Sequence, residues 1–386
     1  MRIAFAITKL FPGGGLQRDC IEIARDVRQR GHDVVVFTTA KDRDFANDLP
    51  IIVLPVKRRT NHGRQTEFSS ILQKAASQQH FDLLVGFDKL DRLDVLYCAD
   101  PSIRGRMLRS PWLFLLPRYR AFHALERSAF APAGNTRLLM LSQQQSKAYQ
   151  DAWHTEPERL TLLPPTVAAA RRRPDLRASG VGARLRSSLA LAPQDWVWLA
   201  IGAKPHTKGL DRSIRALRDF PRARLVAAGL SVTGSRSTRM LASWARRLGA
   251  ADRIVWAGHR EDIPELMAAA DLLVHPARND TTGTVILEAV VNGLPVIATA
   301  VCGYAIHVEA AEAGIVIDEP FAMKKYLAAL TAAQDAARCS HWSAQGMRYG
   351  EQPFLYEGRS RAVEFILATA VERSWRTAVS AAGPAM

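Results

Sequence analysis

Residues 271–298, DLLVHPARNDTTGTVILEAVVNGLPVIA, contain in order an apolar strand, a polar loop, an apolar helix and a second apolar strand. This order is the repeating unit of parallel α/β sheets, because a crossover, usually a helix, must connect two parallel strands. Open sheets of this kind bind ligands beside the carboxyl ends of their strands. The stretch therefore predicts a doubly wound α/β domain with a ligand site in the polar loop.

This stretch carries two acids, Asp280 and Glu288, which stand eight residues apart. On one helix this spacing would place both carboxylates on the same side, about 12 Å apart along the axis. Residues 281–284 predict a cap and turn whose free N–H groups can hold an anion. A phosphate with a carboxylate on each side suits a nucleotide sugar, because the acids can bind ribose and sugar hydroxyls. The alternative is structural, since carboxylates favour the positive end of any helix dipole.

Short apolar strands alternate with amphipathic helices through residue 170, and the same alternation restarts at residue 196. A polar, arginine-rich stretch over residues 168–182 separates the two runs, so we place a domain boundary there. We expect two Rossmann-like doubly wound domains, over residues 1–168 and 169–350, and a C-terminal helix within residues 351–386. The clearest strands are expected at residues 3–7, 34–37, 51–54, 83–85, 138–141, 196–201, 224–228, 254–256, 272–274 and 296–298.

Length and composition narrow the classes of function. A chain of 386 residues is too long for one ordinary core, and 48% hydrophobic residues are enough for two. The sequence contains no run of eighteen apolar residues, so a membrane span is not expected. The first apolar segment is too short for a signal peptide. Cys20, Cys98, Cys302 and Cys339 are scattered, which argues against a zinc site or disulfides and favours a reducing cytoplasm. The net charge of +15 predicts an anionic partner: nucleic acid, anionic lipid or a phosphorylated glycan.

Two loops that follow predicted strands could hold phosphate. Residues 11–19, FPGGGLQRD, form a glycine loop that opens a helix, where missing Cβ atoms let N–H groups approach a phosphate. This loop is not GxGxxG, so a dinucleotide fingerprint is not indicated. In residues 201–209, IGAKPHTKG, Lys208 can set a charge against a diphosphate that gains negative charge as a glycosidic bond breaks. For residues 11–19 the alternative is a glycine turn with a purely structural role. For Lys208 the alternative is a solvated lysine on the surface.

Residues 104–130, RGRMLRSPWLFLLPRYRAFHALERSAF, combine six arginines with an apolar and aromatic patch, and Glu126 is the only acid. Such a segment is typical of an element that lies on an anionic membrane surface. The alternative is a buried core helix with a basic outer face. Nucleic-acid binding is a further alternative, but no recognisable binding module supports it. The expected membrane-associating residues are Arg104, Arg106, Arg109, Trp112, Phe114, Arg118 and Arg120.

Taken together, these segments resemble the retaining nucleotide-sugar glycosyltransferases of the GT-B fold, and among them most closely the lipopolysaccharide core glucosyltransferases of the WaaG type. The resemblance covers most of the chain, and TNHGR and AVCGYA are its most specific motifs. The matching stretches are FPGGGLQRD (11–19), TNHGR (60–64), VGFDKL (85–90), TEPERL (155–160), LLPP (162–165), KGLDRSI (208–214), ELMAAADLLVHPA (265–277) and GLPVIATAVCGYA (293–305).

This resemblance implies two Rossmann-like domains facing an inter-domain cleft, with the donor mainly on the second, the acceptor mainly on the first, and a last helix that crosses back to the first. It implies no metal or other cofactor, because protein charges and helix dipoles neutralise the diphosphate of a UDP-sugar co-substrate. The catalytic residues carried over by motif are Asp280, Lys208 and Asp19. The donor-binding residues are Gly14, Gly15, Lys208, Gly283, Thr284 and, on the ribose, Glu288. The acceptor-side candidates are His62, Arg64, Lys89 and Asp100.

Two positions depart from the family pattern. The first acid of the family motif is usually glutamate, and Asp280 is one methylene shorter. The family also tends to place an arginine just before the lysine, where this chain has His206 and Thr207. Lys204 could substitute as a point charge, although it lacks the bidentate fork of arginine. Both departures bear on donor identity and rate more than on the class of reaction.

The resemblance implies transfer of glucose from UDP-glucose, with retention, to an inner-core heptose of lipopolysaccharide, an alpha-1,3-glucosyltransferase reaction. It also implies a peripheral enzyme on the cytoplasmic face of the inner membrane. The expected partners are a UDP-sugar donor, a lipopolysaccharide inner-core acceptor and an anionic membrane surface, and no nucleic acid. Two alternatives stay open: the same fold with another donor such as a UDP-N-acetylhexosamine, and a non-catalytic membrane- or glycan-binding protein.

Overall fold

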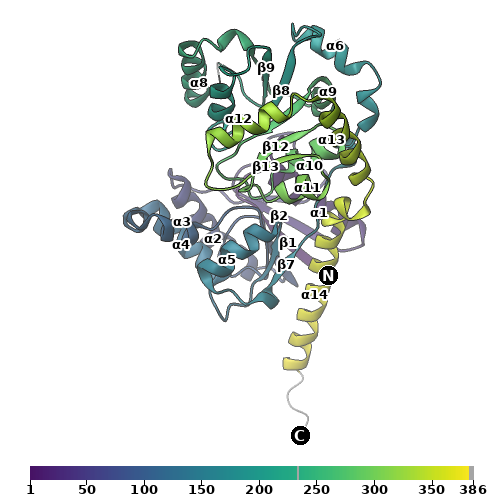
Figure 1. Ribbon diagram of the computed structural model, residues 1–386. Coiled ribbons are helices and arrows are strands. Elements are labelled where there is room, and N and C mark those ends of the chain that lie inside the picture. Colours follow the sequence, from purple (N-terminus) through teal and green to yellow (C-terminus); the bar gives the residue numbers. More distant parts are fainter. Residues whose placement is uncertain (233, 382–386) are drawn as a thin grey trace. The chain divides into compact units, whose positions relative to one another are not determined.

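The structure is a computed structural model that describes residues 1–232 and 234–381, and the chain forms two compact domains (Figure 1). The first comprises Met1–Thr166 and the described chain from Tyr356 onward, and the second comprises Val167–Leu355. The chain therefore enters the second domain at Val167, shortly after the Pro164-Pro165 pair. It returns to the first domain just before its last helix.

The first domain is built on a seven-stranded sheet in which all neighbouring strands are parallel. The strand order is β3-β2-β1-β4-β5-β6-β7, so the direction of winding reverses between β1 and β4. Such a reversal is the switch point at which doubly wound sheets open a crevice beside their carboxyl ends. The strands are β1 (Arg2–Ala6), β2 (Asp33–Thr38), β3 (Ile51–Val53), β4 (Leu83–Gly86), β5 (Val95–Cys98), β6 (Arg137–Met140) and β7 (Leu160–Leu162).

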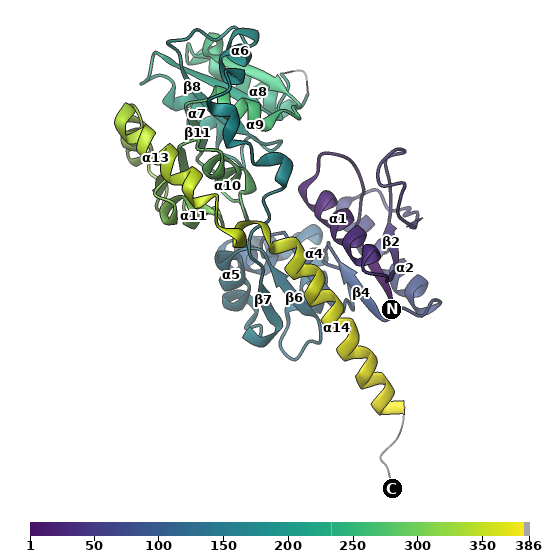
Figure 2. The same ribbon diagram turned by 90° about the vertical axis from the view of Figure 1, so that its right-hand side faces the viewer.

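Helices cover both faces of this sheet. Successive strand residues point to opposite faces, so Ile3 and Phe5 pack in one core with residues of the first and last helices, while Ala4 and Ala6 pack in the other. The last helix, α14 (Gly358–Ala381), packs against α1 and brings Ile366 into the first core (Figure 2). The other helices are α1 (Gly15–Gln29), α2 (Asn61–Ser77), α3 (Ile103–Arg109), α4 (Pro117–Phe130) and α5 (Gln143–Trp153), with 3-10 turns η1 (Pro111–Leu115) and η2 (Pro157–Arg159).

The second domain repeats this plan with a six-stranded parallel sheet in the order β10-β9-β8-β11-β12-β13. Its switch point lies between β8 and β11. The strands are β8 (Trp196–Ile201), β9 (Ala223–Ala228), β10 (Ile254–Gly258), β11 (Leu272–His275), β12 (Val296–Thr299) and β13 (Gly314–Ile317). The helices are α6 (Val181–Ser188), α7 (Leu210–Ala216), α8 (Arg236–Arg247), α9 (Ile263–Ala269), α10 (Thr284–Val291), α11 (Ala305–Ala310), α12 (Met323–Ala332) and α13 (Ala336–Tyr349), with 3-10 turns η3 (Ala169–Arg171), η4 (Pro174–Arg177), η5 (Ala251–Arg253) and η6 (Pro353–Tyr356).

All of the strands predicted from the sequence are present, each to within two residues, and the predicted fold class is confirmed. The sequence did not indicate β5, β7 or β13. Gly314, which opens β13, reads as a strand breaker in the sequence. In the structure a Cβ atom at Gly314 would lie 1.9 Å from the Val296 carbonyl oxygen, so this glycine permits close approach of the β12 backbone.

A buried carboxylate fixes the start of α3 to the first domain. Glu126 on α4 is 0% exposed and accepts hydrogen bonds from Lys89 Nζ (2.7 Å) and Trp153 Nε1 (2.7 Å). It also accepts from Ser102 Oγ and from the backbone N–H groups of Ile103 and Arg104, at the first turn of α3. Burial opposes ionisation of Glu126, but Lys89 and these donors outweigh it and lower the pKa of the carboxyl group.

We expect Glu126→Ala to lower the free energy of unfolding by about 3–5 kcal/mol, because it leaves the Lys89 ammonium buried without its partner. Urea unfolding followed by circular dichroism measures this change. The difference from the wild type should shrink as the pH falls, because a carboxyl group with a lowered folded-state pKa stabilises only while it is ionised. The control is Glu158→Ala, at an exposed position. Equal losses in the two variants would contradict this role of Glu126.

Candidate donor-binding site

The switch point of the second sheet brings two loops together. Strands β8 and β11 are neighbours, with Leu273 beside Leu199. Residues 202–209 follow β8 and carry Lys208, and residues 276–283 follow β11 and carry Asp280. The loops therefore meet at the carboxyl edge of the sheet, where the strand, loop, helix and strand order of the sequence predicted a ligand site.

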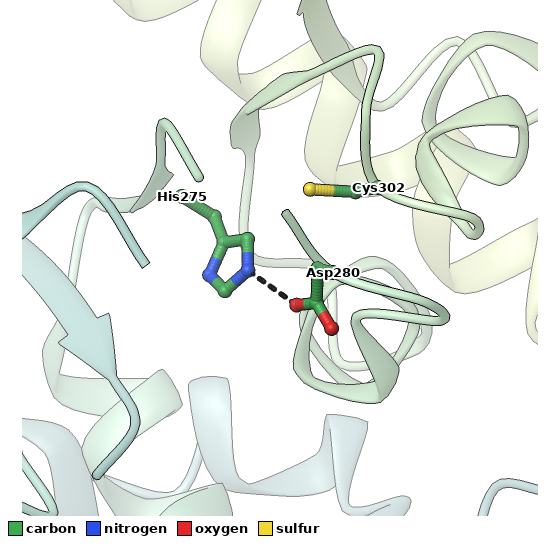
Figure 3. Close-up of side chains that lie close together, drawn as sticks. All are labelled: His275, Asp280 and Cys302. Carbon is green, nitrogen blue, oxygen red and sulfur yellow. Dashed lines mark hydrogen bonds and ion pairs between the residues drawn. The ribbon is translucent and has the colours of Figure 1, made fainter. Parts of the chain in front are cut away.

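Two side chains, Lys208 and His275, hold the Asp280 carboxylate at this edge of the sheet. Its Oδ2 atom lies 2.5 Å from Lys208 Nζ and 2.8 Å from His275 Nε2 (Figure 3, which draws the His275 contact). The side chain of Asp280 is only 10% exposed, and that of Lys208 is 27% exposed. His275 ends β11 and is buried, so the sheet itself fixes the position of the carboxylate.

These contacts determine the charge of Asp280. Burial alone would raise the pKa of its carboxyl group, but the hydrogen bond and charge of His275 and the charge of Lys208 outweigh burial and lower the pKa to about 2. Asp280 is therefore ionised throughout the neutral range. An ionised carboxylate only accepts hydrogen bonds, so it can bind sugar hydroxyls but cannot act as a general acid.

The two acids of the sequence motif do not share a helix, which corrects the expectation from their spacing. Helix α10 begins at Thr284, after Gly283 at φ +73°, so only Glu288 lies on it. Asp280 stands in an extended loop, where its carbonyl oxygen accepts a hydrogen bond from the Gly303 N–H (3.1 Å). The left-handed turn at Gly283 breaks the helix between the acids, and β11 rather than α10 positions Asp280.

The first turn of α10 is suited to an anion. Its N-cap residue is Gly283, which has no side chain to cap the helix, and its first turn contains no acid. The Ile286 N–H already donates to the Gly283 carbonyl oxygen (2.8 Å), so a phosphate would bind to the N–H groups of the two residues before it, and the helix dipole adds to the attraction. Thr284 is the first residue of this turn, and Glu288 is buried one turn further along.

Arg278 joins the lysine loop to the acid loop. Its guanidinium group forms a bidentate pair with Asp211 (both 2.7 Å) and donates to the His206 carbonyl oxygen (2.9 Å). Its backbone N–H donates to the Thr207 carbonyl oxygen (2.8 Å). The sequence predicted no arginine beside His206 and Thr207, and in the structure the arginine that contacts this stretch comes from the other loop. Sequence reasoning missed Arg278, because its partner Asp211 lies 67 residues away.

A second arginine and a glycine complete this junction. Arg212 Nη1 donates to the carbonyl oxygens of Pro276 (2.9 Å) and Ala277 (3.1 Å). Gly209 has φ +72°, and a Cβ atom there would lie 1.8 Å from the Pro276 carbonyl oxygen. Only glycine permits this approach of the two loops.

His275, Asp280 and Cys302 offer three ligand atoms within 4.8 Å of one another, the kind of group that can hold a metal ion (Figure 3). The chemistry of the group does not favour one. The Lys208 ammonium already neutralises the Asp280 oxygen, and burial raises the pKa of the Cys302 thiol to about 12. A divalent cation would have to displace the lysine and deprotonate the thiol.

The glycine loop of the first domain leads into α1 as predicted. Gly14 is the N-cap residue without a side-chain cap, and Gly15 is the first helical residue. A Cβ atom at Gly14 would lie 1.9 Å from Gln17 Oε1. Asp19, one turn further along α1, accepts a hydrogen bond from Tyr97 Oη (3.2 Å), and burial raises the pKa of its carboxyl group.

Asp88 is a second acid at this edge that the sequence did not single out. It follows β4, and its Oδ2 atom accepts a hydrogen bond from the Thr8 N–H (2.6 Å) in the loop that follows β1. Burial raises the pKa of its carboxyl group. Since β1 and β4 form the switch point of the first sheet, the place of Asp88 at the end of the strand in VGFDKL is the signal that could have identified it.

The acceptor-side candidates are all in the first domain, where Gln65 of α2 donates to the Lys89 carbonyl oxygen (3.0 Å). His62 lies at the start of α2, where its ring faces Phe122 of α4 at 6.4 Å, and Arg64 follows it on α2. Lys89 is 7% exposed, and its ammonium group donates to Glu126 and to the Pro101 carbonyl oxygen. Its side chain is thus committed to an internal ion pair, which differs from the predicted acceptor contact. The Asp100 carbonyl oxygen accepts from Tyr149 Oη (3.0 Å).

The segment of residues 104–120 presents apolar side chains to solvent. Trp112 is 63% and Leu115 is 80% exposed, although Leu113 between them is buried. Phe114 is also exposed, as are Arg106, Arg109, Arg118 and Arg120, and the Arg104 guanidinium packs over Trp153. The alternative of a buried helix with a basic outer face describes part of α4 but not η1, which carries Trp112 and Leu115. Within the described residues, no helix is both long enough and apolar enough to cross a bilayer.

Comparison with known sequences identifies the family to which this chain belongs. The family model described as "Glycosyl transferases group 1" matches residues 183–346, which include both loops of the site. The lipopolysaccharide glucosyltransferase WaaG of Escherichia coli K12 is 36% identical over 370 residues, which cover 95% of this chain and 98% of that protein. The D-inositol 3-phosphate glycosyltransferase of Acidothermus cellulolyticus is 28% identical over 360 residues, 79% of this chain and 75% of that protein.

Solved structures agree with this placement. A crystal structure of WaaG, a glycosyltransferase involved in lipopolysaccharide biosynthesis, superimposes with a TM-score of 0.87 at 34% identity and covers 94% of this chain and 99% of its own. The Anabaena protein HepE, in a complex with UDP-glucose, shares the fold with a TM-score of 0.73 at 20% identity over 96% of this chain. The chain is therefore a group 1 glycosyl transferase of the GT-B fold. Within that class it belongs to the WaaG family.

We expect Arg278→Ala to loosen both loops of the site. The variant loses three charge-assisted hydrogen bonds at a partly exposed position, so the free energy of unfolding should fall by about 1–2 kcal/mol. Hydrogen exchange followed by mass spectrometry should show faster exchange in residues 202–209 and 276–283. Arg260→Ala is the matched control, because Arg260 forms a similar pair with Asp262 only two residues away. Unchanged exchange in both loops of the Arg278 variant would refute this role.

Proposed function

We propose that this protein transfers glucose from UDP-glucose, with retention of anomeric configuration, to a heptose of the lipopolysaccharide inner core. The name of the Escherichia coli relative supports the reaction, and the similarity extends over nearly the full length of both chains. On this chain's own residues, one observation carries the proposal. A lysine and a buried, ionised aspartate meet beside an uncapped helix start at the switch point of the second sheet.

The donor diphosphate would bind between Lys208 and the first turn of α10. Lys208 is partly exposed, so its ammonium group can contact a phosphate while it remains beside Asp280. As the glycosidic bond breaks, negative charge grows on the leaving diphosphate. An ammonium group and helix N–H groups already aimed at that position stabilise the charge without reorganisation, which is the largest contribution such a site can make.

The two acids would serve different parts of the donor. Asp280 accepts hydrogen bonds only, so it would bind hydroxyls of the donor sugar or lie against the reacting face. Glu288, on α10, would bind the ribose, and Gly14 and Gly15 of the first domain would approach the phosphates, with Asp19 nearby. Because Asp280 is held by both His275 and Lys208, its shorter side chain is the place where the choice of donor sugar is decided.

The proposed reaction needs neither a metal ion nor a dedicated side-chain base. Lys208 and the α10 dipole would neutralise the diphosphate in place of a cation. In retaining enzymes of this kind the leaving phosphate is thought to accept the proton of the acceptor hydroxyl. The new glycosidic bond then forms on the face from which UDP departs.

The acceptor is anchored in lipid, and we propose that residues 104–120 hold the protein to the cytoplasmic face of the inner membrane. The exposed Trp112 and Leu115 side chains would enter the head-group region, and the surrounding arginines would contact anionic lipid. Glu126, paired with Lys89, fixes the first turn of α3, from which this segment starts.

The reaction is tested by incubating the protein with truncated inner-core acceptor and a panel of UDP-sugars, followed by mass spectrometry. We expect addition of one hexose from UDP-glucose, unaffected by EDTA. Lys208→Met should lower kcat/KM by about 10²–10³-fold, because it removes charge stabilisation at the leaving group. Lys324→Met, an exposed lysine on α12, is the control.

Transfer from a UDP-N-acetylhexosamine alone would replace the donor in this proposal and keep the reaction class. Absence of transfer from every UDP-sugar would refute catalysis. Acceptor binding that survives both Lys208→Met and Asp280→Asn would then identify a non-catalytic glycan-binding protein.

We expect Trp112→Ser with Leu115→Ser to weaken binding to vesicles that contain phosphatidylglycerol by at least about tenfold, because two exposed apolar side chains no longer enter the bilayer. Sedimentation with vesicles measures the bound fraction. Val53→Ser with Leu162→Ser removes two other exposed apolar side chains of the same domain and should leave binding unchanged. If the two double variants bind equally, residues 104–120 do not form the membrane contact.

A further inference from the structure

Arginine is concentrated on one part of the second domain. Between positions 212 and 253 the chain has no lysine and only two acids, Asp219 and Asp252. The arginines in this range are Arg212, Arg215, Arg218, Arg222, Arg224, Arg236, Arg239, Arg246, Arg247 and Arg253. Charge of one sign in this density needs an explanation, because neighbouring like charges destabilise the helices that carry them.

Some of these arginines serve the fold. Arg212 and Arg253 donate to backbone carbonyl oxygens of neighbouring loops, and Arg224 donates to the Asp252 carbonyl oxygen and lies near Asp195. Arg222 donates to the Gln194 carbonyl oxygen. The others are exposed and, among the described residues, form no hydrogen bond or ion pair. They are Arg215, Arg218, Arg236, Arg239, Arg246 and Arg247, named here the arginine face.

The topology places the arginine face on one side of the sheet. Helix α7 connects β8 to β9 and α8 connects β9 to β10, and these strands are consecutive neighbours. Right-handed crossovers that step in the same direction put their helices on the same face of a parallel sheet. The two helices pack against each other, and α8 appears at the outer edge of the second domain (Figure 1). The arginine face therefore lies on one side of the sheet, on and directly after two helices that pack against each other.

Helix α8 has the pattern of a helix that lies on a surface. Its inner face is buried through Thr238, Ala242 and Ala245. Its outer face carries four unpaired arginines and Met240, which is 62% exposed among them. A cationic helix face with an exposed apolar side chain is typical of contact with a membrane interface, where guanidinium groups bind phosphates and the apolar side chain enters the head-group region.

We propose that the arginine face binds the phosphate groups of an anionic phospholipid bilayer. Guanidinium groups bind phosphate through two parallel hydrogen bonds. A nucleic acid also presents phosphates, but among the described residues no nucleic-acid-binding module is recognisable. The exposed apolar residue on this face is Met240, whereas bases stack on aromatic side chains. The proposal does not rest on the transfer reaction and is separate from the contact proposed for residues 104–120.

The test compares two fourfold arginine or lysine replacements in the full chain. One variant carries Arg236→Gln, Arg239→Gln, Arg246→Gln and Arg247→Gln. The control carries Lys324→Gln, Lys325→Gln, Arg338→Gln and Arg348→Gln, which removes the same charge from α12 and α13 of the same domain. Both sets are placed in the Trp112→Ser, Leu115→Ser background as well, so that the contribution of the second domain is measured alone. Circular dichroism and calorimetric titration with UDP check that the variants are folded.

Sedimentation with vesicles of phosphatidylglycerol and phosphatidylcholine in equal parts should show at least about a tenfold loss for the arginine-face variant, with a shallower dependence on salt. The control variant should lose much less vesicle binding. Vesicles of phosphatidylcholine alone should bind all of these proteins poorly. Equal losses in the two variants would overturn the proposal, because binding would then follow net charge alone. A larger loss of duplex DNA or RNA binding than of vesicle binding would overturn it in favour of nucleic acid. Transfer to a soluble truncated acceptor, measured in the same variants, reports separately on the proposed function.

Discussion

A single carboxylate oxygen organises the candidate donor site: Asp280 Oδ2 lies 2.5 Å from Lys208 Nζ and 2.8 Å from His275 Nε2. The three side chains come from two loops and from the strand between them, so the contact fixes the loops relative to the sheet. Removal of any one partner would leave a charge or a buried polar group without compensation, which is more costly than the interaction itself is favourable. The ionised state of Asp280, the position of Lys208 beside α10 and the hydroxyl-binding role proposed for Asp280 all follow from this contact.

Both domains use the same device at the point where their sheets reverse direction. In the first, the Asp88 carboxylate accepts the Thr8 N–H across the loops after β1 and β4. In the second, Asp280 connects the loops after β8 and β11. Neighbouring loops turn to opposite faces at a switch point and leave a crevice. A carboxylate that accepts hydrogen bonds from the opposite loop holds the two sides of that crevice at a fixed distance.

Local patterns made the sheets and the site region predictable, whereas contacts between distant residues were not. The apolar strands follow from their alternation with helices, and the loop positions of Lys208 and Asp280 follow from the strand, loop, helix and strand order. The expectation that Asp280 and Glu288 share a helix was wrong, because helical spacing cannot reveal the left-handed turn at Gly283. The Arg278–Asp211 and Lys89–Glu126 pairs join residues 67 and 37 positions apart, and no local pattern marks such partners.

The anomeric configuration of the product tests the central claim most directly. The measurement is carbon NMR of the product formed from UDP-glucose labelled with ¹³C at C1 and a truncated inner-core acceptor, with EDTA present. The account predicts an α-linked glucose on a heptose, formed by the wild-type protein at the site where Lys208 and Asp280 meet. A β-linked product, or transfer that requires an added divalent cation, would contradict the proposed retaining, metal-independent reaction.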